Sequence, residues 1–301
     1  MRLAAIDIGS NAARLLISDV IQDNEGPLFQ KINLVRVPLR LGFDVFEEKL
    51  ISPEKEAMIL NTLKAYKYLI DAYGVQYLKG AATSAMRDAE NADDIIEKVK
   101  HETGIEIEVI SGDTEASLLY ENHVAENLTR DHGEHAWLYI DVGGGSTELT
   151  FFAEGAMIFK RSFNIGTIRL LKNQVNGALW DDMKDFLKRN IKGHDNDISA
   201  IGSGGNINKV FSLSKRKEGR PLHVESLKDY YKEFSNFTVP ERMRLYNLRE
   251  DRADVIVPAL QIYINVMRWA NIEEIYVPKI GLADGLIQHL YEELKQKKMV
   301  V

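Results

Sequence analysis

The chain has 301 residues, of which 45% are hydrophobic and 28% charged, and its net charge is −7. These values are typical of a folded globular protein that is long enough for two domains. The sequence contains no cysteine, which excludes disulfides, thiolate zinc sites and a cysteine nucleophile, and the acidic charge argues against a general nucleic-acid binder.

Neither the start of the chain nor its most apolar late stretch has the pattern of a targeting or membrane segment. Asp7 interrupts the first apolar run, which is not typical of a signal peptide. Residues 255–270 are interrupted by Pro258 and Arg268, so they are predicted to form a buried helix rather than a membrane span. We therefore expect a cytoplasmic enzyme without a membrane partner. The sequence is compatible with a homodimer.

The first half of the chain begins with two strands joined by a short polar turn. Residues 3–6 are predicted to form a strand that ends at Asp7, and residues 13–20 a second strand that carries Arg14. The later elements expected in this half are a strand at 30–38, a loop after 42, a helix at 53–73, a strand at 77–82, a polar turn at 82–87, a helix at 91–103, a strand at 105–110 and a helix at 113–127.

A polar junction at residues 128–134 separates the two halves, and the second half starts with the same pattern. The expected elements are strands at 137–142, 146–152 and 157–163, helices at 168–175 and 180–191, a strand at 199–202, a helix at 206–213, a basic loop at 215–221, two or three helices within 225–270, a strand at 274–278 and a helix from 282. Because a strand, an aspartate and a glycine-containing turn occur at both Asp7 and Asp141, we expect a duplicated domain.

Three consecutive glycines, residues 143–145, follow the strand that ends near Asp141. Glycine allows backbone N–H groups to approach a ligand closely, and a nest of such groups suits an anion. Asp141 and Glu148 flank the turn, and carboxylates beside a phosphate site indicate a divalent cation. An ordinary hairpin turn with glycine in the left-handed conformation is the alternative reading of this stretch alone.

Nine motifs, in order, resemble the exopolyphosphatase/guanosine pentaphosphate phosphohydrolase (Ppx/GppA) family in its short two-domain form. They lie at residues 7–14, 39–42, 82–87, 110–116, 141–149, 166–170, 202–206, 252–254 and 281–285. The resemblance implies an α/β fold, specifically a duplicated actin-like ATPase fold of the ribonuclease H-like, actin/hexokinase/Hsp70 type, with two lobes around a cleft. It predicts domains at 1–128 and 129–301, with the last helix, 282–301, packing back on the first.

The activity implied by this resemblance is magnesium-dependent hydrolysis of the terminal phosphoanhydride of inorganic polyphosphate, with Mn²⁺ as an alternative cation. Hydrolysis of the 5′-terminal phosphate of guanosine pentaphosphate (pppGpp) is the near alternative. A kinase of the same superfold and a non-catalytic alarmone-binding protein are further alternatives. The expected partner is a polyanionic phosphate substrate and not a nucleic acid. No Walker-type Gly-x-x-x-x-Gly-Lys-Ser/Thr pattern occurs, which argues against a P-loop enzyme.

The resemblance identifies Glu115 as the base that acts on the attacking water, with Glu148 as a second catalytic carboxylate. An acid in the first turn of a helix also stabilises that helix, and this is the alternative role of Glu115. The predicted metal ligands are Asp141, Asp7 and Glu148, where Asp7 has turn capping as its alternative role. Glu148 could instead orient the water.

Substrate contacts are expected from backbone N–H groups and from cations that follow the motif turns. The residues are Gly9, Ser10, Asn11, Arg14, Arg40, Thr83, Ser84, Arg87, Gly143, Gly144, Gly145, Ser146, Gly204, Gly205 and Arg252. Arginine suits this role because its guanidinium binds phosphate in a bidentate manner.

The chain also departs from the family pattern in three places. Ala283 and Asp284 replace the usual Arg-Glu pair, Asn206 stands where threonine is common, and residues 43–46 lack the usual small side chains. A cation expected near the substrate is therefore missing. These departures bear on substrate length and preference more than on the reaction.

Overall fold

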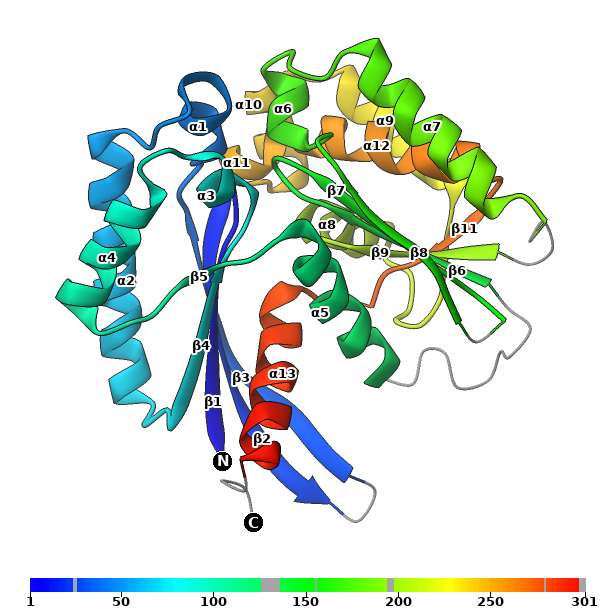
Figure 1. Cartoon of the computed structure of the whole chain (residues 1–301). Helices are drawn as coiled ribbons and strands as arrows, with labels where there is room; N and C mark the ends of the chain where they lie inside the picture. The colour runs from blue at the N-terminus through cyan, green and yellow to red at the C-terminus, as the bar shows by residue number, and fades with distance from the viewer. Residues whose placement is uncertain (24–25, 126–135, 155, 194–197, 279, 298–301) are drawn as a thin grey trace. The chain divides into compact units, whose positions relative to one another are not determined.

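The structure, a computed structural model drawn in Figure 1, describes residues 1–23, 26–125, 136–154, 156–193, 198–278 and 280–297. The chain divides into two compact units: one comprises Met1–Asn122 and Leu282–Val301, and the other His123–Gly281. The C-terminal helix α13 (Leu282–Gln296) therefore belongs to the first unit. The boundary predicted at residues 128 and 129 lies outside the described residues and stays a prediction.

A five-stranded mixed sheet, in the order β3-β2-β1-β4-β5, forms the centre of the first unit. Its strands are β1 (Arg2–Ile8), β2 (Ala12–Asp23), β3 (Gly26–Pro38), β4 (Tyr77–Ala82) and β5 (Glu108–Val109). β1 pairs antiparallel with β2 and parallel with β4. Its residues from Leu3 onward are buried, because an apolar central strand is covered on both faces.

Helices pack on this sheet within the first unit. α2 (Pro53–Ala72) begins after Ser52, whose hydroxyl accepts from the Lys55 N–H, and it packs against α4 (Ala92–Thr103). α5 (Gly112–Ala125) and α13 share one apolar cluster with β1 and β2, in which Leu118 and Leu286 are buried. The sheet therefore fixes the start of α5, which carries Glu115.

The second unit contains a six-stranded mixed sheet in the order β10-β11-β9-β6-β7-β8. Its strands are β6 (Ala136–Val142), β7 (Thr147–Ala153), β8 (Ala156–Phe163), β9 (Ile198–Ser203), β10 (Leu222–His223) and β11 (Glu274–Tyr276). β6 is central: it pairs antiparallel with β7 and parallel with β9.

Five strands of each sheet repeat the same order and directions. The series β3-β2-β1-β4-β5 corresponds to β8-β7-β6-β9-β11, with two antiparallel pairings followed by two parallel ones in both units. This repeat confirms the predicted fold class, an α/β fold with duplicated actin-like topology.

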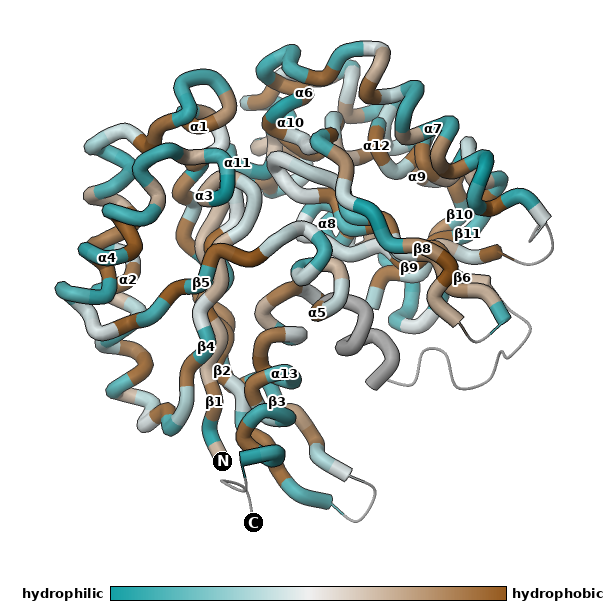
Figure 2. Tube along the Cα trace, viewed as in Figure 1, coloured by the Kyte–Doolittle hydropathy of each residue, from teal (hydrophilic) through white to brown (hydrophobic). Residues whose placement is uncertain are grey.

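The second unit has its own helices and its own core. The helices are α6 (Thr167–Leu171), α7 (Gly177–Ile191), α8 (Gly205–Ser214), α9 (Val224–Ser235), α10 (Val239–Tyr246), α11 (Glu250–Ala253) and α12 (Ile256–Trp269). α12 is the most apolar, with eight buried residues, whereas α7 buries only Met183, Leu187 and Ile191 along one face. Figure 2 shows hydrophilic and hydrophobic colours alternating along α7. Among the described residues, no helix combines the length and apolar character of a membrane span.

Four sequence-based element predictions were wrong. The loop expected after residue 42 is helix α1 (Gly42–Glu48), and the polar turn expected at 82–87 contains helix α3 (Ser84–Asp88), in which Ala85 and Met86 are buried. The strand expected at 105–110 is reduced to β5, because only two residues pair with β4. The helix expected at 168–175 ends at Leu171, and Asn173 takes a left-handed conformation with φ 54°.

Gly285 allows α13 to approach the backbone of α5. A Cβ at this position would lie 2.3 Å from the carbonyl oxygen of Leu118. We predict that Gly285→Ala lowers the free energy of unfolding by about 1–3 kcal/mol, because one of the two helices must move. Gly177→Ala is the matched control, since nothing lies within 4 Å of a Cβ there, and it should be neutral or stabilising by up to about 1 kcal/mol. Denaturant unfolding measures both, and equal stability of the two variants would contradict the close approach.

Candidate active site

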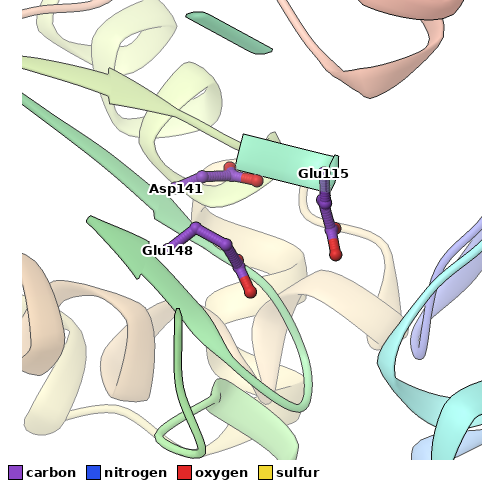
Figure 3. A group of neighbouring side chains, drawn as sticks. All are labelled: Glu115, Asp141 and Glu148. Atoms are coloured by element: carbon purple, nitrogen blue, oxygen red, sulfur yellow. The ribbon is translucent and has the colours of Figure 1, made fainter. Parts of the chain in front are cut away.

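Two acidic side chains face each other on neighbouring strands of the second unit. Asp141 at the end of β6 is the cross-strand partner of Glu148 in β7. Figure 3 draws both side chains on these strands, and Glu115 on α5. Glu148 is 3% exposed, and like charges directly opposite one another destabilise a sheet. A bound cation would relieve this repulsion, so the pair has the chemistry of a divalent cation site.

Serine hydroxyl groups fix the orientation of both carboxylates. Ser203 Oγ donates to Asp141 Oδ1 at 2.6 Å. Ser146 Oγ and Ser162 Oγ donate to Glu148 Oε1 at 2.6 and 2.9 Å. Groups that orient acidic side chains in this way commonly support metal ligands.

The tight turn between β6 and β7, Gly143–Ser146, is called the glycine turn below. Its carbonyl groups are engaged by the start of α6. Thr167 N–H donates to Gly143 O at 3.0 Å, and Ile168 N–H donates to Gly144 O at 2.8 Å. The Arg169 side chain donates through Nε to Gly145 O at 2.8 Å. Gly166 permits the close approach of this segment to the glycine turn, because a Cβ at Gly166 would lie 2.4 Å from Gly144 O.

These three bonds determine which way the N–H groups of the glycine turn point. The described residues contain no cis peptide, and in a trans peptide the N–H points opposite to the preceding carbonyl. The N–H groups of Gly144, Gly145 and Ser146 therefore point away from α6. A row of such groups is a typical anion-binding nest.

A second glycine pair follows β9 in the same unit. Gly204 lies beside the Asp141 carboxylate, because a Cβ at Gly204 would be 3.2 Å from Oδ1. Gly205 begins α8, and the Arg252 guanidinium from α11 lies directly against it. The structure thus brings four predicted site residues together: Asp141, Gly204, Gly205 and Arg252.

Tyr263 supports this arrangement from the buried helix α12. Its hydroxyl donates to the Ser203 carbonyl. Burial, and then the negative charge of Asp141, raises the pKa of the Tyr263 hydroxyl well above its ordinary value. The hydroxyl therefore stays a protonated donor across the physiological pH range and holds the end of β9 in place.

The corresponding hairpin of the first unit carries opposite charges. Asp7 is the cross-strand partner of Arg14, and Arg14 forms an ion pair with Asp7 Oδ2. In the repeated topology Arg14 thus occupies the position that Glu148 has in the second unit. Burial, and then the charge of Asp7, raises the pKa of the nearby Tyr66 hydroxyl. The roles predicted for Asp7 and Arg14 stay predictions, and the ion pair favours the second hairpin as the cation site.

The turn of the first hairpin is held by the chain that follows β3. Gly42 N–H donates to Ser10 O at 2.9 Å, and Arg40 N–H donates to Asn11 O at 2.9 Å. Ser10 Oγ lies 2.7 Å from Ser84 Oγ, which joins two predicted substrate residues. The Arg40 guanidinium lies over the Phe43 ring, 4.2 Å from its centroid.

Glu115 lies in the first turn of α5 and is 8% exposed. Arg87 Nη1 donates to Glu115 Oε2 at 3.2 Å and to Ile110 O at 2.8 Å. The second bond ties the guanidinium to the segment that leads into α5. Arg87 therefore orients the carboxylate predicted to act on water.

Four residues with structural roles at these sites were not assigned roles in the sequence analysis: Ser162, Arg169, Ser203 and Tyr263. Arg169 and Ser203 lie inside motifs of the sequence, so their positions were visible although their contacts were not. Ser162 and Tyr263 come from β8 and α12 and carry no motif. The pairing of β7 with β8 brings Ser162 opposite Glu148, and a sequence does not display that register.

Comparisons with known proteins agree with the geometry. The model of the Ppx/GppA phosphatase family matches residues 20–295. The chain is 31% identical to the bifunctional 3-dehydroquinate synthase/phosphatase of Fusobacterium nucleatum, covering 98% of this chain and 47% of that protein. It is 26% identical to exopolyphosphatase 1 of Mycobacterium bovis, covering 95% of this chain and 87% of that protein.

A solved structure is similar over nearly the whole chain. The crystal structure of the Ppx/GppA family member from Aquifex aeolicus is 27% identical, with a TM-score of 0.75, and the match covers 97% of this chain and 98% of that one. The predicted family and enzyme class, a phosphoanhydride hydrolase, are thereby confirmed. The chain belongs to the Ppx/GppA phosphatase family.

Proposed function

We propose that the protein is an exopolyphosphatase, which removes the terminal phosphate of inorganic polyphosphate in the presence of Mg²⁺. The observation that carries the proposal is the glycine turn, which joins the strands of Asp141 and Glu148 and whose three N–H groups point away from α6. A polyphosphate end has the negative charge that such N–H groups bind. Its phosphate oxygens can also share a cation with the two carboxylates.

We propose that Asp141 and Glu148 hold the cation and that Glu115 acts on the water, with Asp7 as a further candidate ligand. Asp141 and Glu148 each offer a carboxylate oxygen, the hard donor that Mg²⁺ prefers. When bound, the cation would neutralise negative charge on the substrate. The opposed pair in the second unit gives the cation two ligands whose orientation is already fixed by serine hydroxyls.

In the proposed reaction Glu115 accepts a proton from water as the water oxygen forms a bond to the terminal phosphorus. The bridging P–O bond breaks, and its electron pair stays on the shortened chain. The ion pair with Arg87 holds the Glu115 carboxylate in place. This is compatible with phosphoryl transfer, because its loose transition state depends mainly on positioning and charge neutralisation.

The remaining predicted substrate residues would bind the phosphate chain. Arg252 lies at the N-terminus of α8, where its charge adds to that of the helix dipole. Gly9, Ser10, Asn11, Thr83 and Ser84 stay predicted contacts, as do Arg14 and Arg40.

The substrate proposal predicts phosphate release from polyphosphate that requires Mg²⁺. The measurement is inorganic phosphate released from polyphosphate, pppGpp and ATP, each with added Mg²⁺ and with EDTA. We expect the highest kcat/KM for polyphosphate and no turnover with EDTA. Faster turnover of pppGpp would instead support the guanosine pentaphosphate phosphohydrolase, and release from none of the three would contradict the proposed exopolyphosphatase activity.

Glu115→Gln should abolish turnover while leaving the fold intact. We expect kcat to fall roughly 10²- to 10⁴-fold, the usual contribution of a general base, with an unchanged melting temperature. Asp113→Asn is the matched control, because Asp113 is exposed in the first turn of the same helix. If both variants lose the same activity, the role of Glu115 is only to stabilise the N-terminus of α5.

Glu148→Gln should weaken the cation site more than the substrate site. We expect the Mg²⁺ concentration for half-maximal activity to rise at least about tenfold, since a charged ligand becomes neutral while its serine bonds are retained. Asp182→Asn serves as control, because Asp182 forms an exposed ion pair with Arg161 on the same unit. An unchanged Mg²⁺ requirement in Glu148→Gln would exclude Glu148 as a ligand.

A further inference from the structure

The third carbonyl of the glycine turn is held differently from the other two. Gly143 O and Gly144 O accept from backbone N–H groups at the start of α6. Gly145 O accepts from the side chain of Arg169, through Nε at 2.8 Å. A hydrogen bond from a charged donor is stronger than one between neutral groups.

In the first unit, the carbonyls of the corresponding turn are bound by backbone N–H groups alone. Its turn carbonyls, Ser10 O and Asn11 O, accept from the backbone N–H groups of Gly42, Leu39 and Arg40 at 2.9, 3.2 and 2.9 Å. In both units the turn carbonyls are therefore engaged by the segment that follows the third strand. In the second unit one of these bonds depends on a particular residue type.

The Gly145–Ser146 peptide needs this bond more than an ordinary turn peptide does. Gly144 and Gly145 have no Cβ and allow rotations that other residues resist. With Gly145 O bound to Arg169, the Ser146 N–H on the same peptide points away from α6. Without the guanidinium, the peptide could rotate and turn its carbonyl towards the anion.

We propose that Arg169 is a positioning residue that aims the Ser146 N–H at the terminal phosphate of the substrate. This rests on the proposed function of the glycine turn as the phosphate site. The guanidinium acts through the peptide, and the N–H donor is oriented before the substrate binds. Preorientation of this kind stabilises a transition state at no reorganisation cost.

The test compares Arg169→Ala and Arg169→Lys with Arg189→Ala. Arg189 is a matched control, because its Nε also donates to a backbone carbonyl, Asp185 O at 3.1 Å, on the exposed face of α7. We expect kcat/KM for polyphosphate to fall roughly tenfold to hundredfold in Arg169→Ala, as when one transition-state donor is impaired. Arg169→Lys should recover part of the loss, and Arg189→Ala should equal the unchanged protein.

A second readout follows the amide itself. In the unchanged protein and in Arg189→Ala, adding pyrophosphate with Mg²⁺ should shift the ¹⁵N amide resonance of Ser146, whereas in Arg169→Ala the shift should be largely lost. A merely structural role would lower the melting temperature without selectively removing this shift. If Arg169→Ala does not fold, Arg169→Lys is measured in its place.

The outcomes separate this proposal from the proposed function. If the unchanged protein releases no phosphate from polyphosphate but its Ser146 resonance shifts in an Arg169-dependent way, the exopolyphosphatase proposal fails and the positioning role holds. Wild-type kcat/KM and a full Ser146 shift in Arg169→Ala would overturn the positioning role. So would a Ser146 resonance that pyrophosphate does not move in the unchanged protein.

Discussion

The direction of three peptide groups in the glycine turn is the constraint on which the candidate site depends. Glycine makes this turn conformationally free, so its own sequence does not set the direction of its N–H groups. The start of α6 sets this direction, because residues 167–169 donate hydrogen bonds to the carbonyls of Gly143, Gly144 and Gly145. The helix thus converts three flexible residues into an ordered row of donors.

Duplication explains why the two hairpins look alike and act differently. Both units place an aspartate at the end of the central strand and clamp the following turn from the segment after the third strand. At the facing position the first unit has Arg14 and the second has Glu148. The first hairpin therefore pairs its aspartate with a cation, whereas the second places two acidic side chains opposite each other. A difference in side-chain charge at one repeated position thus distinguishes the ion pair of the first hairpin from the proposed cation site of the second.

Motifs in the sequence predicted the hairpins, the repeat and the position of Glu115 at a helix start, because these features depend on residues close together in the chain. The short helices α1 and α3 were missed, since segments of seven and five residues are too short to show a helical period of apolar residues. The ion pair that engages Asp7 and the serine bonds of Glu148 were missed for another reason. They follow from strand register, and Ser162 reaches Glu148 only because β8 pairs with β7.

The opposed carboxylates also have a physical cost that bears on function. Two acids facing each other across a buried strand pair repel, and serine hydroxyls offset only part of this repulsion. The second unit tolerates this arrangement because β6 is a central strand, paired with β7 and β9 and in contact with α12. In addition, Tyr263 stays a neutral donor that holds the end of the neighbouring strand β9. The packed core around the two acids opposes any movement that would separate them. Binding of a cation is therefore the more favourable way to relieve their repulsion.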